Sequence, residues 1–135
     1  MSSLSRDFIE SLLVLRDKGI RYSTCIDVGC ADGSFFLHMH SLGVFKSTVP
    51  MNVDANTLYE PSLRQIKDVL LGDFAICAVS DHDGEIELVM SNNPYWSSVR
   101  TEDDLYWKRI NGSMQSKVAV PALTLDSLAA KYRLK

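Results

Sequence analysis

Residues 25–36, CIDVGCADGSFF, constrain the fold of this chain more than any other stretch. An apolar run ends at Val28, the glycines Gly29 and Gly33 follow, and a second apolar run begins at Phe35. Glycine readily adopts the left-handed backbone of a tight turn, and the start of a helix offers unpaired N–H groups to a ligand. The stretch therefore predicts a strand, a turn that a ligand can approach closely, and a helix.

The apolar periodicity of the rest of the chain predicts alternating strands and helices. Strands are expected over residues 23–29, 47–54 and 73–80, and helices over residues 4–18 and 34–43. A third helix begins near Pro61 and is marked by the run Leu63, Ile66, Val69 and Leu70. The fold class is therefore expected to be α/β, with three parallel strands and flanking helices. Residues 85–90 and 117–125 are expected to extend the sheet beyond the third strand as an antiparallel hairpin, before a final helix from Leu125.

Length and charge exclude several classes of protein. The chain of 135 residues suits one domain, which we place over residues 1–135 with a leading amphipathic helix within residues 1–20. The net charge of −3 is mild and unclustered, which disfavours nucleic acid and membranes as partners. With no signal peptide or membrane-spanning run, a cytoplasmic location is expected. The cysteines are an odd number without a CxxC pair, so neither disulfides nor a zinc site is expected.

The turn lacks the dinucleotide-binding fingerprint. That fingerprint requires G-x-G-x-x-G, whereas Ala31 and Ser34 occupy its second and third glycine positions counted from Gly29. Asp27 instead gives the pattern D-x-G-x-x-x-G, which resembles the first motif of the class I S-adenosylmethionine-dependent methyltransferases. An acidic residue beside the turn suits a cofactor that carries a cationic sulfonium group and no pyrophosphate.

Four segments in chain order extend this resemblance: TCIDVGCADGSFF, NVDANTLYEPSL, AICAVSDHDGEIEL and VAVPALTLDSL. Together, over residues 22–130, they resemble the FkbM family of methyltransferases. The resemblance implies a Rossmann-like class I sheet, S-adenosyl-L-methionine as cofactor, and O-methylation of a hydroxyl group on a sugar or other small metabolite. It also implies a set of cofactor-binding residues, which are Asp27, Gly29, Cys30, Ala31, Asp32, Gly33, Asp54, Ala55, Ala78 and Ser80.

Two acids compete for the role of binding the ribose hydroxyls. The carboxylate is expected roughly 20 residues after the glycine turn, at the end of the second strand. Asp54 is near that distance from Gly33, whereas Glu60 lies further on, at the expected start of a helix. We therefore assign the ribose to Asp54 and interpret Glu60 as a helix N-terminal acid that the helix dipole favours.

The family resemblance implies later strands, with a Lys-x-Asp-x-Glu-Gly motif, that this sequence does not contain. We therefore expect a truncated domain, the cofactor-binding half of a methyltransferase, and identify no general base. The strand over residues 23–29 would then have an open side, because the fourth parallel strand normally lies beside it. We expect self-association through that edge or a fragment that has lost its other half, and the alternative is that the final helix covers the edge.

Other interpretations stay open at this point. A different Rossmann-like enzyme that binds a nucleotide, or a non-catalytic interaction module, would carry the same alternation of strands and helices. The segment NNPYW, residues 92–96, is interpreted as a loop. Tyr106, Trp96 and Trp107 either line an acceptor pocket or anchor an irregular segment. Cys30 is either a nucleophile or a small side chain that the turn requires.

Overall fold

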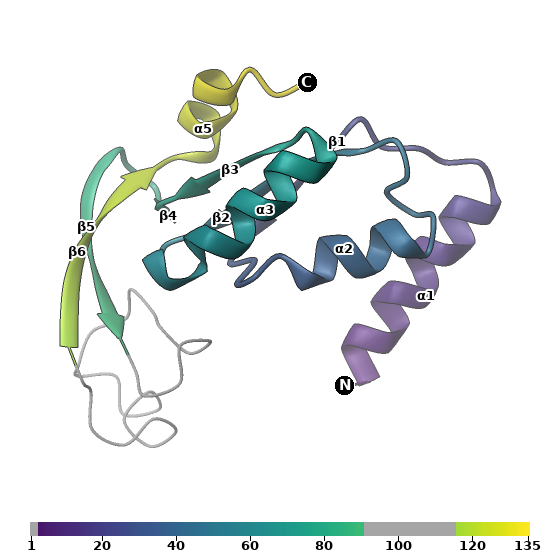
Figure 1. The fold of residues 1–135 in the computed structure, drawn as a ribbon, viewed down its shortest axis with the longest axis horizontal. Coiled ribbons are helices and arrows are strands. Elements are labelled where there is room, and N and C mark those ends of the chain that lie inside the picture. The colour runs from purple at the N-terminus through teal and green to yellow at the C-terminus, as the bar shows by residue number, and fades with distance from the viewer. Residues whose placement is uncertain (1–2, 91–115) are drawn as a thin grey trace.

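The computed structural model describes residues 3–90 and 116–135, in which helices pack against the first of two small sheets (Figure 1). The elements in chain order are α1 (Ser3–Asp17), β1 (Thr24–Val28), α2 (Ser34–Ser41), β2 (Val49–Asp54), α3 (Glu60–Leu70), β3 (Asp73–Ile76), β4 (Ala78–Val79), β5 (Gly84–Met90), β6 (Ser116–Leu123) and α5 (Leu125–Tyr132). The predicted helices and strands are present, except that the strand predicted over residues 73–80 is split into two.

The first sheet is parallel and has the order β1-β2-β3. Ile26 of β1 pairs with Met51 of β2, and Met51 pairs with Asp73 of β3. The connections between these strands contain α2 and α3, as parallel strands require a crossover. The predicted α/β class, with three parallel strands and flanking helices, is confirmed at this level.

One apolar cluster joins α1 and α2 to the first strand. Phe36 and Met39 of α2 are fully buried, and the ring of Phe36 stacks on Phe45 with 5.2 Å between centroids. Cys25 of β1 packs against the same cluster. The residues that α1 contributes are Ile9, Leu12 and Leu13. α1 therefore lies on the same side of the sheet as α2, next to β1.

The third helix is amphipathic, but its apolar face is narrower than the sequence pattern indicated. Leu63 and Ile66 are buried against the sheet, and Phe74 and Ile76 of β3 pack on the same cluster. Val69, which was grouped with these residues in the pattern, is 76% exposed. Leu70, the next residue, packs on the same cluster, and Val69 is rotated about 100° from it around the helix axis, so Val69 lies outside the buried face.

The chain changes sheets at Cys77. The backbone N–H of Cys77 still donates to the carbonyl of Asp54 in β2, at 3.0 Å, but the next residue begins β4, which pairs in parallel with β6. β5 and β6 form the predicted antiparallel pair. They do not simply extend the first sheet, because together with β4 they form a second sheet in the order β4-β6-β5.

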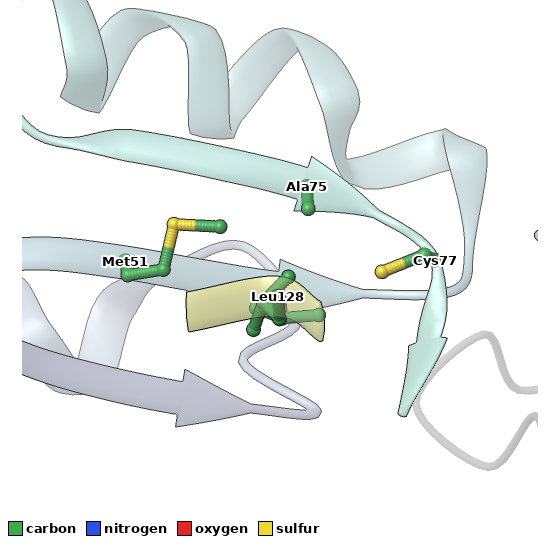
Figure 2. Packing of buried hydrophobic residues seen from close by; sticks show 5 residues of the cluster. Met51, Ala75, Cys77 and Leu128 are labelled. Carbon is green, nitrogen blue, oxygen red and sulfur yellow. The ribbon is translucent and has the colours of Figure 1, made fainter. Parts of the chain in front are cut away.

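α5 packs on the face of the first sheet opposite to α2 and α3. Figure 2 shows Leu128 of α5 directed at Met51, Ala75 and Cys77 of the sheet region, and all four side chains are buried. Successive residues of a strand face opposite sides, so Met51 and Ala75 face α5 while Phe74 faces α3. Strands β2 and β3 are thereby covered on both faces.

The turn between β4 and β5 fixes the start of α5. Asp83 accepts hydrogen bonds from the backbone N–H of Thr124 at 2.8 Å and from the hydroxyl of Ser127 at 2.5 Å. Thr124 also caps the helix, because its hydroxyl accepts from the N–H of Ser127 at 3.0 Å. The hydrogen bonds from Ser127 and Thr124 hold the pKa of Asp83 below its ordinary value.

We expect Asp83→Ala to loosen α5, because both bonds to the helix start are lost. Asp81→Ala is the matched control, since the side chain of Asp81 contacts Ser80 and His82 instead. Hydrogen exchange over residues 125–132 should be faster in Asp83→Ala and unchanged in Asp81→Ala. The stabilisation by Asp83 is present above pH 3.8 and is lost as the pH falls through its lowered pKa. Equal exchange rates in the two variants would contradict this assignment.

Candidate functional site

The glycine turn is attached to the end of β2. The N–H groups of Gly29 and Cys30 both donate to the carbonyl of Val53, at 2.8 and 3.1 Å. The turn then closes on itself, because the N–H of Gly33 donates to the carbonyl of Cys30 at 2.9 Å. Gly29, Ala31 and Gly33 have positive φ angles of 74°, 51° and 79°. The predicted sequence of strand, tight turn and helix is therefore present.

The two glycines of the turn have different surroundings. A Cβ atom at Gly29 would have nothing within 4 Å, so the backbone there borders open space that a ligand can enter. A Cβ atom at Gly33 would lie 2.4 Å from Cδ1 of Ile66 and 3.2 Å from Cδ2 of Leu63. The sequence suggested that both glycines admit a ligand, but in the structure Gly33 allows the start of α2 to approach α3.

We expect Gly33→Ala to lower the free energy of unfolding by about 1–2 kcal/mol more than Gly29→Ala does. Both substitutions place a side chain on a left-handed backbone, so the conformational cost of the positive φ angle is the same in the two variants. The additional cost at position 33 comes from displacing the buried side chains of Leu63 and Ile66. Urea unfolding of the two variants measures the difference, and equal losses would show that α2 and α3 do not depend on close contact at this glycine.

Asp54 connects the turn to the rest of the sheet. Its Oδ2 accepts from the N–H of Ala31 at 2.9 Å, and its Oδ1 accepts from the N–H of Asn56 at 2.8 Å. A carboxylate oxygen can accept two hydrogen bonds, so each oxygen keeps one position for a further donor. Glu60 is remote from this arrangement, since it is the first residue of α3 and pairs with Arg64 at 2.7 Å. These positions agree with the choice of Asp54 for the ribose, which stays a prediction.

Asp27 is a half-buried acid with one buried oxygen that lacks a partner in the described part of the chain. Its Oδ2 is buried and has no hydrogen-bond partner among the described residues. Asn52, its paired residue on β2, is 1% exposed and also has an unpartnered side-chain oxygen within this part of the chain. Burial, followed by the nearby charge of Asp54, raises the pKa of Asp27. A cationic group bound beside Asp27 would compensate for the burial of its charge and for the repulsion from Asp54.

We expect Asp27→Asn to increase the free energy of unfolding at neutral pH, because one oxygen of the ionised carboxylate is buried without a partner among the described residues. A raised pKa means that the fold favours protonated Asp27, so the wild type loses stability as the pH rises through that pKa. The increase in the free energy of unfolding of Asp27→Asn, relative to the wild type, should therefore be absent below pH 3.8 and present at pH 7. Urea unfolding at several pH values measures it.

Asp54→Asn is the matched control for this measurement. The new amide group keeps one accepting oxygen, and its nitrogen cannot accept a hydrogen bond. One of the bonds from Ala31 and Asn56 is therefore lost, and we expect the free energy of unfolding at pH 7 to fall by about 1–3 kcal/mol. If Asp27→Asn were as destabilising as Asp54→Asn, the oxygen of Asp27 would have a stabilising partner that the geometry does not give it.

The other residues of the turn have structural roles. Oδ1 of Asp32 accepts from the N–H of Ser34 at 3.1 Å and so orders the start of α2. Cys30 is buried and packs on Tyr59 and Leu63. Burial, followed by the charges of Asp27 and Asp54, raises the pKa of the Cys30 thiol to about 12. A thiol with this pKa is almost entirely protonated at neutral pH, so the geometry gives no support to a nucleophilic Cys30.

The remaining predicted site residues are Ala55, Ala78 and Ser80. Ala55 follows Asp54 and packs against the core of the second sheet. Ala78 is buried in that core, and it presents almost no surface to a ligand. The hydroxyl of Ser80 contacts Asp81 and His82, and no contact joins it to the glycine turn. The structure therefore brings together Asp27, Asp54 and the turn. Ala78 directly follows Cys77, whose N–H donates to the carbonyl of Asp54, and the binding roles of Ala78 and Ser80 stay predictions.

Sequence reasoning missed two buried amides beside the site. Asn52 lies within an apolar strand, and Asn56 caps the turn before α3 by accepting from the N–H of Leu58 at 3.0 Å. Nδ2 of Asn56 is buried and has no partner among the described residues. A polar residue between Met51 and Val53 is the signal that could have indicated a polar environment under the turn.

Several predictions fall outside the residues that the structure describes. These are the loop interpretation of residues 92–96 and the roles considered for Trp96, Tyr106 and Trp107. Within residues 3–90 and 116–135, no helix is long and apolar enough to cross a membrane. In the same residues, no three acidic, histidine or cysteine side chains are grouped as a metal site would require.

Comparisons with models of protein families, with curated proteins and with solved structures found no match for this chain. The family resemblance, the cofactor and the activity that it implies therefore remain proposals that depend on the residues themselves.

Proposed function

We propose that this chain binds S-adenosyl-L-methionine at the turn after β1 and belongs to a methyltransferase of the Rossmann-like class I. The acceptor that we propose is a hydroxyl group of a sugar or other small metabolite. The observation that carries the proposal is the position of Asp54, whose carboxylate ends β2 and accepts hydrogen bonds from the glycine turn and from the residue that follows β2. Ligands of open parallel sheets bind at this carboxyl end of the strands.

The carboxylate of Asp54 fits a ribose. Two backbone N–H groups, those of Ala31 and Asn56, hold its two oxygens in a fixed orientation. Each oxygen retains one acceptor position, which matches the two neighbouring hydroxyl donors of a ribose. Because the carboxylate is already oriented, little conformational entropy is lost when the ligand binds.

Gly29 and Asp27 fit the amino-acid portion of the cofactor. The open space at Gly29 lets a ligand approach the backbone closely. The unpartnered Oδ2 of Asp27 is a buried acceptor that an ammonium or sulfonium group would neutralise. A cation at this position would favour ionised Asp27, so ligand binding should release a proton in the pH range where Asp27 is partly protonated.

When bound, the cofactor would supply a methyl group on a sulfonium centre, with the acceptor oxygen as nucleophile and a thioether as leaving group. The residues of the chain hold the donor in a fixed position beside β1 and β2, which is the main requirement of an in-line displacement. The proton of the acceptor hydroxyl needs a base, and we assign that role to no described residue. The proposal therefore concerns cofactor binding first and the transfer second.

We expect S-adenosylhomocysteine, the demethylated product, to bind in a calorimetric titration, and Asp54→Asn to weaken it about 10- to 100-fold through loss of a charged acceptor. Glu60→Gln is the matched control, because it changes a neighbouring acid that pairs with Arg64 on α3. Its affinity should stay within about twofold of the wild type, since exposed ion pairs contribute little. A larger loss at Glu60 would reverse the assignment of the ribose.

A second variant tests the turn. Gly29→Asn adds a side chain where a Cβ atom would enter open space, and asparagine tolerates a positive φ better than most residues. We expect this variant to fold and to lose the affinity for S-adenosylhomocysteine.

A parallel titration of the wild type with NAD distinguishes a methyltransferase from a nicotinamide-dependent enzyme, because the latter would bind NAD in preference to S-adenosylhomocysteine. Failure to bind either ligand would favour an interaction module.

A further inference from the structure

The strand that carries Asp27 has an open edge. In the described residues β1 pairs with β2 alone, so half of its backbone N–H and C=O groups point away from the sheet. Ile26 and Val28 are 39% and 50% exposed on the face opposite to α2. The single charged side chain of β1, Asp27, lies on the other face. The sequence of β1, TCIDV, contains no lysine or proline, and its pairing with β2 has no bulge, so the usual protections of an edge strand are absent from it.

The final helix does not cover this edge. Leu128 of α5 packs on Met51 and Val53, which belong to β2. The end of the chain reaches the beginning of β1, where the hydroxyl of Ser23 donates to the carbonyl of Lys135 at 3.3 Å and Thr24 lines the same pocket as Lys135. The predicted alternative, in which the helix from Leu125 covers the first strand, is therefore wrong for the described residues.

The charges at the two ends of β1 favour an antiparallel partner of the same sequence. Arg21 is exposed just before the strand, and Asp32 follows it in the turn. A second copy that runs antiparallel places each basic end beside the partner's acidic end, and does so twice because the contact is symmetric. A parallel copy would place like charges together.

The side chains also select a register. With Ile26 opposite its own copy, Thr24 faces Val28 of the partner, and the exposed apolar residues of both chains form one stripe on the same face. Cys25 then lies opposite Asp27 of the partner. A register shifted to place Asp27 opposite itself would bring two half-buried carboxylates together, which is unfavourable because like charges repel.

We infer that the β1 edge is a self-association surface, at which two copies of the chain pair antiparallel around Ile26 and join their three-stranded sheets into one. The partner is a second copy, because the strand is complementary to itself in both charge and apolar pattern. This inference does not depend on the proposed cofactor.

Sedimentation velocity over a wide range of concentrations tests the inference. The wild type should show a monomer–dimer equilibrium. Ile26→Lys places two lysines opposite each other and should raise the dissociation constant more than about tenfold, as should Ile26→Glu. An equimolar mixture of these two variants should form the dimer again, because lysine then faces glutamate. Val118→Lys is the matched control, since Val118 is an equally exposed strand residue on β6, and it should associate like the wild type.

Circular dichroism verifies that each variant is folded. Val28→Lys is a second substitution on the same face and should also weaken association, so a folding defect at position 26 leaves the inference testable. A wild type that is monomeric at all concentrations overturns the inference. So does a dimer that persists in folded Ile26→Lys or Val28→Lys, or a mixture of the two Ile26 variants that fails to associate while each is folded.

Discussion

The carboxylate of Asp54 is the interaction on which the arrangement of the site depends. Its two oxygens bind the N–H groups of Ala31 and Asn56, and its backbone carbonyl accepts from Cys77. One residue therefore connects the turn after β1, the turn before α3, and the point where the chain passes from the first sheet to the second. The two bonds to the carboxylate are charge-assisted and partly buried, so they are stronger than the bond between neutral groups that Cys77 makes.

Asp27 shows the opposite use of a carboxylate. Its oxygen is buried next to the charge of Asp54 and no described group compensates for it, so the ionised form destabilises the fold. Proteins tolerate such a cost mainly at sites where a ligand removes it. The two acids therefore differ in their surroundings: backbone N–H groups bind both oxygens of Asp54, whereas Oδ2 of Asp27 has no partner among the described residues.

The sequence predicted the order of elements well because their apolar periods are local properties. It did not predict the split at Cys77, because that depends on pairing with Asp54 and with β6, which lie far away in the chain. The roles of the glycines were also inaccessible, since the need for Gly33 comes from Ile66 of a helix that follows much later. Motif spacing singled out Asp27 and Asp54, but only packing shows that Ala78 is buried in the core of the second sheet.

The two edges of the first sheet differ in a way that bears on the site. At the β3 edge the strand continues into β4 and a second sheet, whereas β1 has an edge free of strand partners in the described residues. The turn at Gly29 follows directly from this five-residue strand. A ligand at the turn and a partner at the edge would therefore both contact the same short segment, which β2 holds on its other side.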